Sequence, residues 1–444
     1  MTKRWACALL LAATACSDAP VTTPAGVLTA LIEEGPPRTE ADEDTLASLD
    51  QILDCLQEVR GWDFEEPVVV GFYDRGQLAD WILDHFFDGS SPEEFELSTR
   101  AYKALGFIPR DMDLVEVLLD TLTVQVGGFY DVYEKQLYAV SSGLGVMNKY
   151  VMIHEAGHAL QDQHADLEAF VYEGETPKQD DRFLAKASVV EGGATVVTNQ
   201  VLARCDDLIT AEDFDAAGLG EVFVTQLVGS SGVPPVIIDG MTFPYMEGAT
   251  FVQTVLDAGG WDAVNDLYRN PPRSSEQVMH PEKFLDPARA DEPIPARAPD
   301  MAGFLGPGWR TVYRNGLGEL GVRQLVRFTG DPGQTFRASW GWGGDEYRLY
   351  ENPNGEEFFQ WVTAWDSERD AVDMMVAMEN VLIRQSSEQP GVKVTLNDDA
   401  TVLTLHDADG TLRELARRED AWMVWFRGMR PGFPAQSMAD RCLP

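Results

Sequence analysis

The sequence predicts an α+β fold divided into two domains. The chain has 444 residues, which is more than one hydrophobic core usually serves. Its composition, with 44% hydrophobic and 10% aromatic residues, is that of a globular protein. Residues 286–307 are crowded with proline, alanine and aspartate, and they separate a helix-rich first part from a second part in which strands predominate. We therefore expect domains at 42–287 and 313–444, joined by a linker at 288–312.

Hydrophobic periodicity and residue type predict the elements of both domains. In the first domain the expected elements are a helix at 42–60, a strand at 68–72, helices at 77–87, 97–105 and 114–122, a β-hairpin of 123–130 and 136–140, and helices at 148–163, 181–203 and 248–257. In the second domain they are a helix at 316–328, strands near Tyr347 and at 358–363, 392–396, 402–406 and 422–426, and a helix at 367–383.

The N-terminus resembles a secretion signal. Two basic residues precede an apolar stretch that ends in small residues before Cys16, and this stretch is too short to span a bilayer. The pattern is similar to the lipobox of bacterial lipoproteins, in which this cysteine carries a lipid, although alanine stands at position 13 where leucine is usual. We expect a signal peptide at 1–15, a tether at 16–41, and a protein that is secreted or lipid-anchored to a membrane in a bacterial cell envelope.

The charge of the chain argues against anionic partners. Its 73 acidic and 34 basic residues give a formal net charge of −39. Phosphate backbones and anionic lipid surfaces would repel such a protein, so we expect no nucleic-acid partner.

The cysteines permit at most one disulfide. If Cys7 leaves with the signal peptide and Cys16 is lipidated, an odd number of cysteines remains, and the sequence does not select a pair among Cys55, Cys205 and Cys442. None of them has zinc-finger spacing, so a structural zinc site built on cysteine is not expected.

The helix expected at 148–163 carries an H-E-x-x-H pattern formed by His154, Glu155 and His158. Residues four apart lie about 40° apart around a helix, so the two imidazoles project from one face and can bind one metal ion. Glu155 lies beside that face, where it can act as a general base on a water molecule at the metal. The other interpretation, that both histidines are ordinary core residues, requires the pattern to have arisen by chance.

Two residues compete for the role of third metal ligand, which a catalytic zinc site needs. Glu191 lies on the next helical segment after an apolar run, and an unpaired carboxylate there would be costly to bury unless a metal neutralised it. His164 has the spacing of the metzincin pattern, but that pattern has a glycine where Gln161 stands, and glutamine favours a continuing helix. On a continuous helix His164 would point away from the metal, so we favour Glu191.

The order of elements resembles the gluzincin arrangement of thermolysin-like zinc peptidases: a hairpin, then a helix with the H-E-x-x-H pattern, then a second helix with a glutamate. The chain is more similar still to a group of bacterial and archaeal gluzincin-like proteins, over roughly residues 68–287. The motifs that carry this resemblance are Gly128-Phe129-Tyr130-Asp131, His154-Glu155 through His158-Ala159-Leu160-Gln161-Asp162-Gln163-His164, Val190-Glu191-Gly192-Gly193-Ala194-Thr195, Phe243-Pro244-Tyr245, and Ser275 through Phe284.

The resemblance implies a gluzincin-like catalytic domain with zinc bound by His154, His158 and Glu191 and with Glu155 as the catalytic base. One position departs from the family pattern, because Gly193 stands where an acidic residue is usual. If that acid orients a metal ligand, this chain lacks the contact, and the geometry of the ligands would be weakened.

His280 and Tyr245 are weaker candidates for catalytic residues. Either side chain could donate a hydrogen bond to the oxyanion that forms during peptide hydrolysis, and packing or loop hydrogen bonding would explain each equally well.

The sequence thus predicts a zinc-dependent hydrolase, and more narrowly a peptidase whose partner is a peptide or protein substrate. Three alternatives stay open: a metzincin-like site that uses His164, a zinc hydrolase acting on an amide or ester that is not a peptide, and an envelope lipoprotein of peptidase fold without turnover. Other divalent ions can occupy the same ligands, and the sequence does not indicate the oligomeric state.

Overall fold

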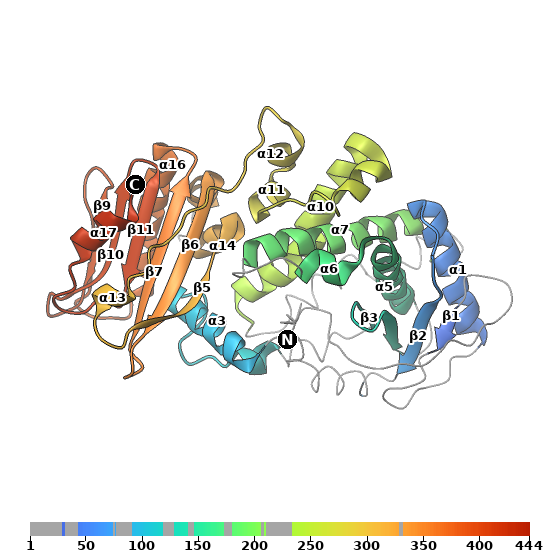
Figure 1. Cartoon of the computed structure of the whole chain (residues 1–444), viewed down its shortest axis with the longest axis horizontal. Coiled ribbons are helices and arrows are strands. Elements are labelled where there is room, and N and C mark those ends of the chain that lie inside the picture. The colour runs from blue at the N-terminus through green and yellow to red at the C-terminus, as the bar shows by residue number, and fades with distance from the viewer. Residues whose placement is uncertain are drawn as a thin grey trace. The chain divides into compact units, whose positions relative to one another are not determined.

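The protein has an α+β fold with two β-sheets, as the sequence predicts. The computed structural model describes residues 29–31, 43–73, 76, 91–118, 128–140, 146–172, 180–205, 208–209, 233–327 and 332–444 (Figure 1). The expected signal peptide and Cys16 lie outside these residues, as does the helix expected at 77–87. In the described part of the chain, no helix is both long and apolar enough to cross a membrane.

The chain divides into two compact units. The first comprises Met1–Glu94, Asp113–Gly174 and Lys186–Pro271, and the second comprises Phe95–Met112, Glu175–Ala185 and Pro272–Pro444. The second unit therefore takes in three stretches of the range 42–287 that was predicted as one domain: Phe95–Met112, Glu175–Ala185 and the residues from Pro272 onwards.

Polar contacts explain why one of these segments belongs to the second unit. Arg100, on helix α3 (Pro92–Leu105), bonds Glu351 at 2.5 Å and Glu357 at 2.7 Å, and Gln385 donates to the carbonyl of Leu105.

The first unit contains a four-stranded sheet in the order β1-β2-β4-β3. β1 (Thr29–Leu31), β2 (Val68–Tyr73) and β4 (Gln136–Val140) run parallel, and β3 (Gly128–Asp131) closes an antiparallel hairpin with β4. The predicted hairpin is thus confirmed for its described part, and residues 123–127 of the expected first strand lie outside the described residues. β1 falls within the predicted tether at 16–41, where the sequence analysis expected no regular structure, because Thr29–Leu31 pair with Val68–Val70.

Long helices pack beside this sheet. α1 (Glu43–Arg60) buries the apolar set that predicted it, and Leu49, Ile52, Leu53 and Leu56 are all fully buried. α5 (Val146–Ala165), α6 (Leu167–Tyr172) and α7 (Asp180–Arg204) follow. α10 (Pro235–Asp266) consists of two helical segments that meet at a kink at Gly260, where the backbone is not helical. The first segment begins well before the helix expected at 248–257, because Pro244 is accommodated inside it.

The second unit is built on a seven-stranded antiparallel sheet. The strand order is β5-β6-β7-β11-β10-β9-β8, and the strands are β5 (Arg310–Asn315), β6 (Trp342–Glu351), β7 (Glu357–Trp365), β8 (Lys393–Leu396), β9 (Val402–His406), β10 (Leu412–Glu419) and β11 (Trp422–Arg427). The sequence analysis missed β5 and β10. β10 reads Leu-Arg-Glu-Leu-Ala-Arg-Arg-Glu, which lacks strand composition, and pairing with β9 and β11 on both sides makes it a strand.

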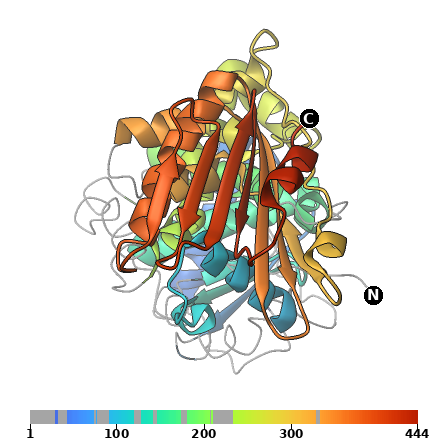
Figure 2. The ribbon, with the colours of Figure 1, turned by 90° about the vertical axis from the view of Figure 1, so that its left-hand side faces the viewer.

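Helices cover both faces of this sheet. α14 (Gly318–Val326), α15 (Pro332–Trp340) and α16 (Glu368–Gln385) form a group, and α16 buries Met374, Met378 and Leu382 against the strands. α17 (Ala435–Cys442) packs on the other face against Tyr350, Phe358, Val424 and Phe426 (Figure 2, the red helix in front of the sheet).

Part of the predicted linker at 288–312 belongs to the second unit. Ala298 and Met301 are buried in the core cluster beside α17, and the Ile294 amide donates to the carbonyl of Gly343 at 2.5 Å. α11 (Ser275–Met279), α12 (Pro281–Leu285) and α13 (Ala302–Leu305) also lie in this unit. The proline-rich composition that suggested a boundary instead marks an extended segment packed on the sheet.

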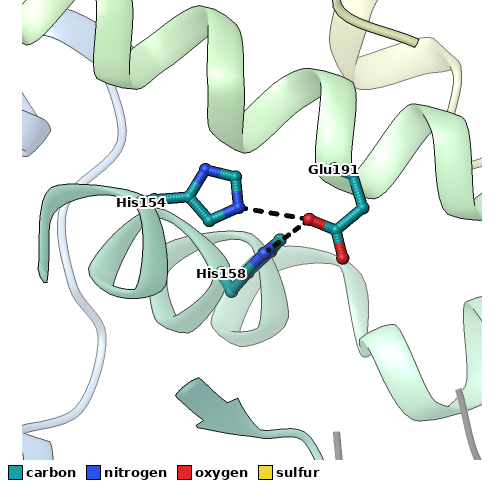
Figure 3. Close-up of side chains that lie close together, drawn as sticks. All are labelled: His154, His158 and Glu191. Atoms are coloured by element: carbon teal, nitrogen blue, oxygen red, sulfur yellow. Dashed lines mark hydrogen bonds and ion pairs between the residues drawn. The ribbon is translucent and has the colours of Figure 1, made fainter. Parts of the chain in front are cut away.

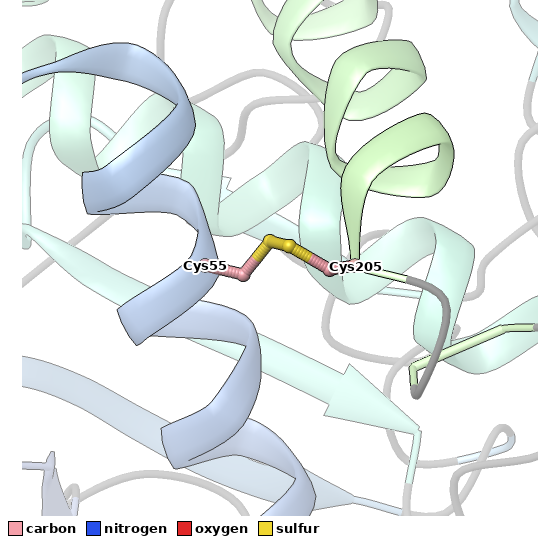
Figure 4. Close-up of a disulfide and its surroundings, with 2 residues drawn as sticks. All are labelled: Cys55 and Cys205. Atoms are coloured by element: carbon pink, nitrogen blue, oxygen red, sulfur yellow. A yellow bond between two sulfur atoms is a disulfide. The ribbon is translucent and has the colours of Figure 1, made fainter.

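A disulfide joins Cys55 on α1 to Cys205 at the end of α7, with their Cα atoms 6.6 Å apart (Figure 4). Cys442 is a buried free thiol. The bond connects segments that are 150 residues apart in the chain, and it holds the end of α7 to α1 within the first unit.

We predict that breaking this disulfide destabilises the first unit by roughly 2–5 kcal/mol, because the open chain gains conformational freedom in the unfolded state. Thermal unfolding of the wild type should shift downwards when a reductant is added, and the Cys55→Ser/Cys205→Ser variant should melt at that lower temperature with or without reductant. Cys442→Ala is the control, and it should keep the response to reductant. Equal melting temperatures for wild type and double variant in oxidising buffer would contradict the prediction.

Candidate metal centre

Three side chains from two helices meet at one point in the first unit. His154 and His158 project from α5, and Glu191 reaches them from α7 (Figure 3). The Oε2 atom of Glu191 lies 3.1 Å from Nε2 of each histidine. All three residues are buried, with relative exposures of 7%, 5% and 8%. This group could hold a metal ion.

Small residues let the two helices come close enough for this meeting. A Cβ atom at Gly157, next to His158, would lie 3.7 Å from the Cα of Ala194 and 3.3 Å from a methyl carbon of Val197. Gly157 lies inside α5 although glycine has a low helix propensity, and its lack of a side chain suits the close packing of α5 on α7.

A second close contact positions α10 against α7. A Cβ atom at Gly192 would lie 2.3 Å from the backbone of Gly248, and one at Gly248 would lie 2.5 Å from the carbonyl oxygen of Ser188. The helix backbones therefore touch next to Glu191. One turn before Gly248, the ring of Tyr245 lies 5.7 Å from that of His154.

The donor atoms fit a zinc ion. Zinc accepts imidazole nitrogen and carboxylate oxygen at about 2.0–2.2 Å in tetrahedral sites, so two of its ligand atoms are roughly 3.3 Å apart. The two separations of 3.1 Å in this group are close to that value. The rings of His154 and His158 stand perpendicular, with centroids 4.7 Å apart, so their nitrogens approach the common point from different directions.

Electrostatics within the group favour a bound cation. Burial would raise the pKa of the Glu191 carboxyl, but the two histidines outweigh burial and hold that pKa far below its usual range. Burial would lower the pKa of His158, but the Glu191 carboxylate outweighs it and raises the pKa to about 9. The carboxylate is thus ionised and attracts positive charge between itself and the imidazoles, which is where a metal ion would lie.

Glu155, the proposed base, is held by the backbone of β3. Its Oε2 atom accepts a hydrogen bond of 2.9 Å from the amide of Tyr130, and the residue is 4% exposed. Burial raises the pKa of Glu155, and His158 and His154 partly offset this effect. The hairpin therefore fixes the carboxylate that directly follows His154.

Asp162 ties the same hairpin to α5. It accepts hydrogen bonds from the Tyr130 hydroxyl at 2.7 Å and from the Lys135 ammonium at 2.8 Å, both from the hairpin, and from the amide of Leu167 at 2.8 Å.

Gln161 contacts His158, one of the candidate ligands, directly. The Nδ1 atom of His158 lies 2.9 Å from Oε1 of Gln161, and the Nε2 atom of Gln161 donates to the carbonyl of Val190 at 3.0 Å. If an acidic residue at position 193 orients a metal ligand in the family, Gly193 leaves this chain without that contact. His158 has a different partner, because Gln161 contacts it from its own helix. In the sequence, the signal for this contact is that Gln161 follows His158 by three residues.

His164 does not join the group. α5 continues as a helix to Ala165, so His164 points elsewhere, and its Nε2 atom lies 2.8 Å from the carbonyl oxygen of Asp63. Its ring stacks on Trp62 with centroids 4.4 Å apart. The structure therefore favours Glu191 over His164 as the third donor, as the helix argument predicted.

The two candidates for oxyanion stabilisation have different surroundings. Tyr245 lies beside His154 within the first unit, so the structure brings it to the group. His280 belongs to the second unit, where its Nε2 atom lies 2.9 Å from Oε2 of Glu319 and its ring packs edge-on against Trp340. The structure thus gives His280 a carboxylate partner within its own unit.

A second group of acidic residues, in the second unit, already surrounds a cation of the protein itself. The Lys283 ammonium lies 2.6 Å from Glu276, 2.7 Å from Asp291 and 3.1 Å from Asp366. An ammonium has three N–H donors, and these three carboxylates use all of them. The group is an internal network of ion pairs, and the lysine already occupies the position that a metal ion would take.

Comparison with known proteins gives little information about this site. Residues 310–424 match a family described as a domain of unknown function (DUF8575), which covers the sheet of the second unit from β5 into β11 and excludes the metal group. No match was found among curated proteins.

One solved structure matches the chain. It is that of a provisionally assigned hydrolase with a novel fold from Chloroflexus aurantiacus, which is 19% identical, with 56% of this chain and 90% of that chain covered. The TM-score is 0.37, so this similarity carries no argument about fold or activity.

We predict that His154→Ala, His158→Ala and Glu191→Ala each reduce bound zinc from about one ion per chain to almost none, because the site has only three protein donors. His164→Ala is the matched control on the same helix, and it should keep its zinc. Elemental analysis of the four purified variants after dialysis is the measurement. Loss of zinc from His164→Ala together with retention by Glu191→Ala would instead establish the metzincin-like alternative.

Proposed function

We propose that the protein is a zinc-dependent hydrolase, and more narrowly a gluzincin-like peptidase of the bacterial cell envelope. The observation that carries this proposal is the convergence of His154, His158 and Glu191 beside Glu155. Two imidazoles and one glutamate are the donor set of catalytic zinc in thermolysin-like enzymes, and this set leaves a fourth position open for reaction.

The carboxylate of Glu155 suits the role of general base. Its place after His154 on the helix and its hydrogen bond to the Tyr130 amide fix it beside the metal ligands. Burial raises its pKa above the usual range of a carboxyl, which makes its carboxylate a stronger base than an exposed one.

The chemistry divides between the metal and this carboxylate. A bound zinc ion supplies polarisation of the scissile carbonyl and lowers the pKa of water. Glu155 takes the proton of the attacking water at its carboxylate and afterwards donates it to the leaving amine. Tyr245, beside His154, is the candidate for a hydrogen bond to the oxyanion, and its side chain is largely buried.

The disulfide supports an extracytoplasmic location. Bonds such as Cys55–Cys205 persist in oxidising compartments, which include the bacterial periplasm and the cell surface. The signal-like N-terminus points to the same compartments, with Cys16 as the proposed site of a lipid anchor. The strongly acidic composition is compatible with a peptide or protein substrate and unfavourable for nucleic acid.

We predict that Glu155→Gln lowers the rate of hydrolysis by about 10²–10⁴-fold and leaves zinc content unchanged, because the base is lost and the three ligands remain. Cleavage of casein and of a peptide library by the full chain, with and without a chelator, is the measurement. Glu58→Gln, an exposed glutamate on α1, is the control and should keep full activity.

Three results would separate the alternatives. Chelator-sensitive cleavage that Glu155→Gln abolishes supports the peptidase. Hydrolysis of model esters or simple amides without cleavage of any peptide would replace it with a different zinc hydrolase. A protein that binds zinc tightly and hydrolyses none of these substrates would be a binding protein of peptidase fold.

A further inference from the structure

We propose that Gln161 is a positioning residue that sets the affinity of the site for zinc, and that the missing side chain at Gly193 is what admits it. This inference rests on the proposed function in assuming that the histidines and Glu191 bind zinc. It concerns the metal-binding step and makes no assumption about the substrate.

The orientation of the Gln161 amide follows from its backbone partner. The carbonyl oxygen of Val190 can only accept a hydrogen bond, so the amide nitrogen of Gln161 must face it, at 3.0 Å. The amide oxygen of Gln161 then faces Nδ1 of His158, at 2.9 Å. This oxygen can only accept, so the Nδ1 atom must carry the proton.

This hydrogen bond selects the tautomer of His158 that binds metal. When Nδ1 of a neutral imidazole is protonated, its Nε2 atom has a free lone pair. In His158 that atom faces Glu191 at the centre of the group. A partner that holds the far nitrogen of a metal-binding histidine fixes the direction of its ring and increases its basicity.

Gln161 also connects the two helices that supply the ligands. It stands on α5 with both histidines, and it bonds the carbonyl of Val190, which directly precedes Glu191 on α7. One side chain thus constrains the ring of His158 and the backbone that carries the third donor. Because Gln161 is 4% exposed, little water is available to replace either bond.

Gly193 leaves the space that this amide occupies. A Cβ atom at position 193 would lie 2.6 Å from the Nε2 atom of Gln161, which is closer than any real contact, and 3.5 Å from the hydroxyl of Tyr268. Any side chain at position 193 must therefore displace the amide from its partners.

The first test measures zinc affinity by competition with a chromogenic chelator, with the full chain and zinc alone. Gln161→Ala and Gln161→Met should each weaken binding by about 10–100-fold, as loss of a partner behind a metal ligand commonly does. Methionine keeps the length of the side chain, so agreement between the two variants excludes a cavity as the cause.

Gln163→Met is the matched control for this test. Gln163 is also on α5, and its amide bonds the backbone of Glu65 and Glu66 instead of a metal ligand. It should bind zinc like the wild type. If both Gln161 variants also bind like the wild type, the proposal is wrong.

The second test is a double-mutant cycle. Gly193→Ala should weaken zinc binding in the wild type by about tenfold or more, because it displaces the amide of Gln161. In the Gln161→Ala background it should have almost no further effect, since the space is then free. Additive losses would show that Gly193 acts independently of Gln161 and would overturn the proposal.

Cobalt(II) substitution provides a readout that does not involve turnover. The visible absorption of the bound ion depends on the ligand geometry, so it should change in Gln161→Ala and remain the same in Gln163→Met. If the wild type binds zinc but cleaves no peptide, the peptidase proposal fails and the role of Gln161 stands. If the peptidase activity is present and Gln161→Ala binds zinc normally, only the present inference fails.

Discussion

The close approach of α5 and α7 is the constraint on which the rest of the site depends. Glu191 reaches both imidazoles where two small residues, Gly157 on α5 and Ala194 on α7, face each other. The contact between Gly192 and Gly248 extends the same principle to α10. Glycine lowers the local stability of a helix. Here it also allows the helix backbones to approach closely, and donor atoms from different segments lie about 3 Å apart.

Burying this much charge requires compensation on every side. The Glu191 carboxylate is balanced by the imidazoles, and Glu155 has a backbone donor in Tyr130. Asp162 is neutralised by Lys135 and two further donors. The hairpin of β3 and β4 supplies three of these partners, namely the amide and hydroxyl of Tyr130 and the ammonium of Lys135. It therefore stabilises the buried carboxylates of α5 as well as forming the sheet edge.

The sequence predicts the ligands and their helices because the chemistry and the periodicity coincide there. His154 and His158 share a face by spacing alone, and Glu191 is exceptional in its apolar surroundings. The local sequence pattern predicts the wrong element where tertiary contacts determine the structure. β10 has the composition of a helix and becomes a strand between two partners, and α10 continues through Pro244. The contact of Gln161 with His158 has a local signal in their spacing, but its contacts with Val190 and Gly193 have none, because these residues lie about 30 positions away on another helix.

The central claim is that one ion lies between His154, His158 and Glu191. Anomalous diffraction at the zinc edge, from crystals of the wild type grown with zinc, tests it most directly. The account predicts a single strong peak about 2.0–2.2 Å from Nε2 of both histidines and from a carboxylate oxygen of Glu191. A peak bonded to His164, or no peak within reach of Glu191, would contradict it.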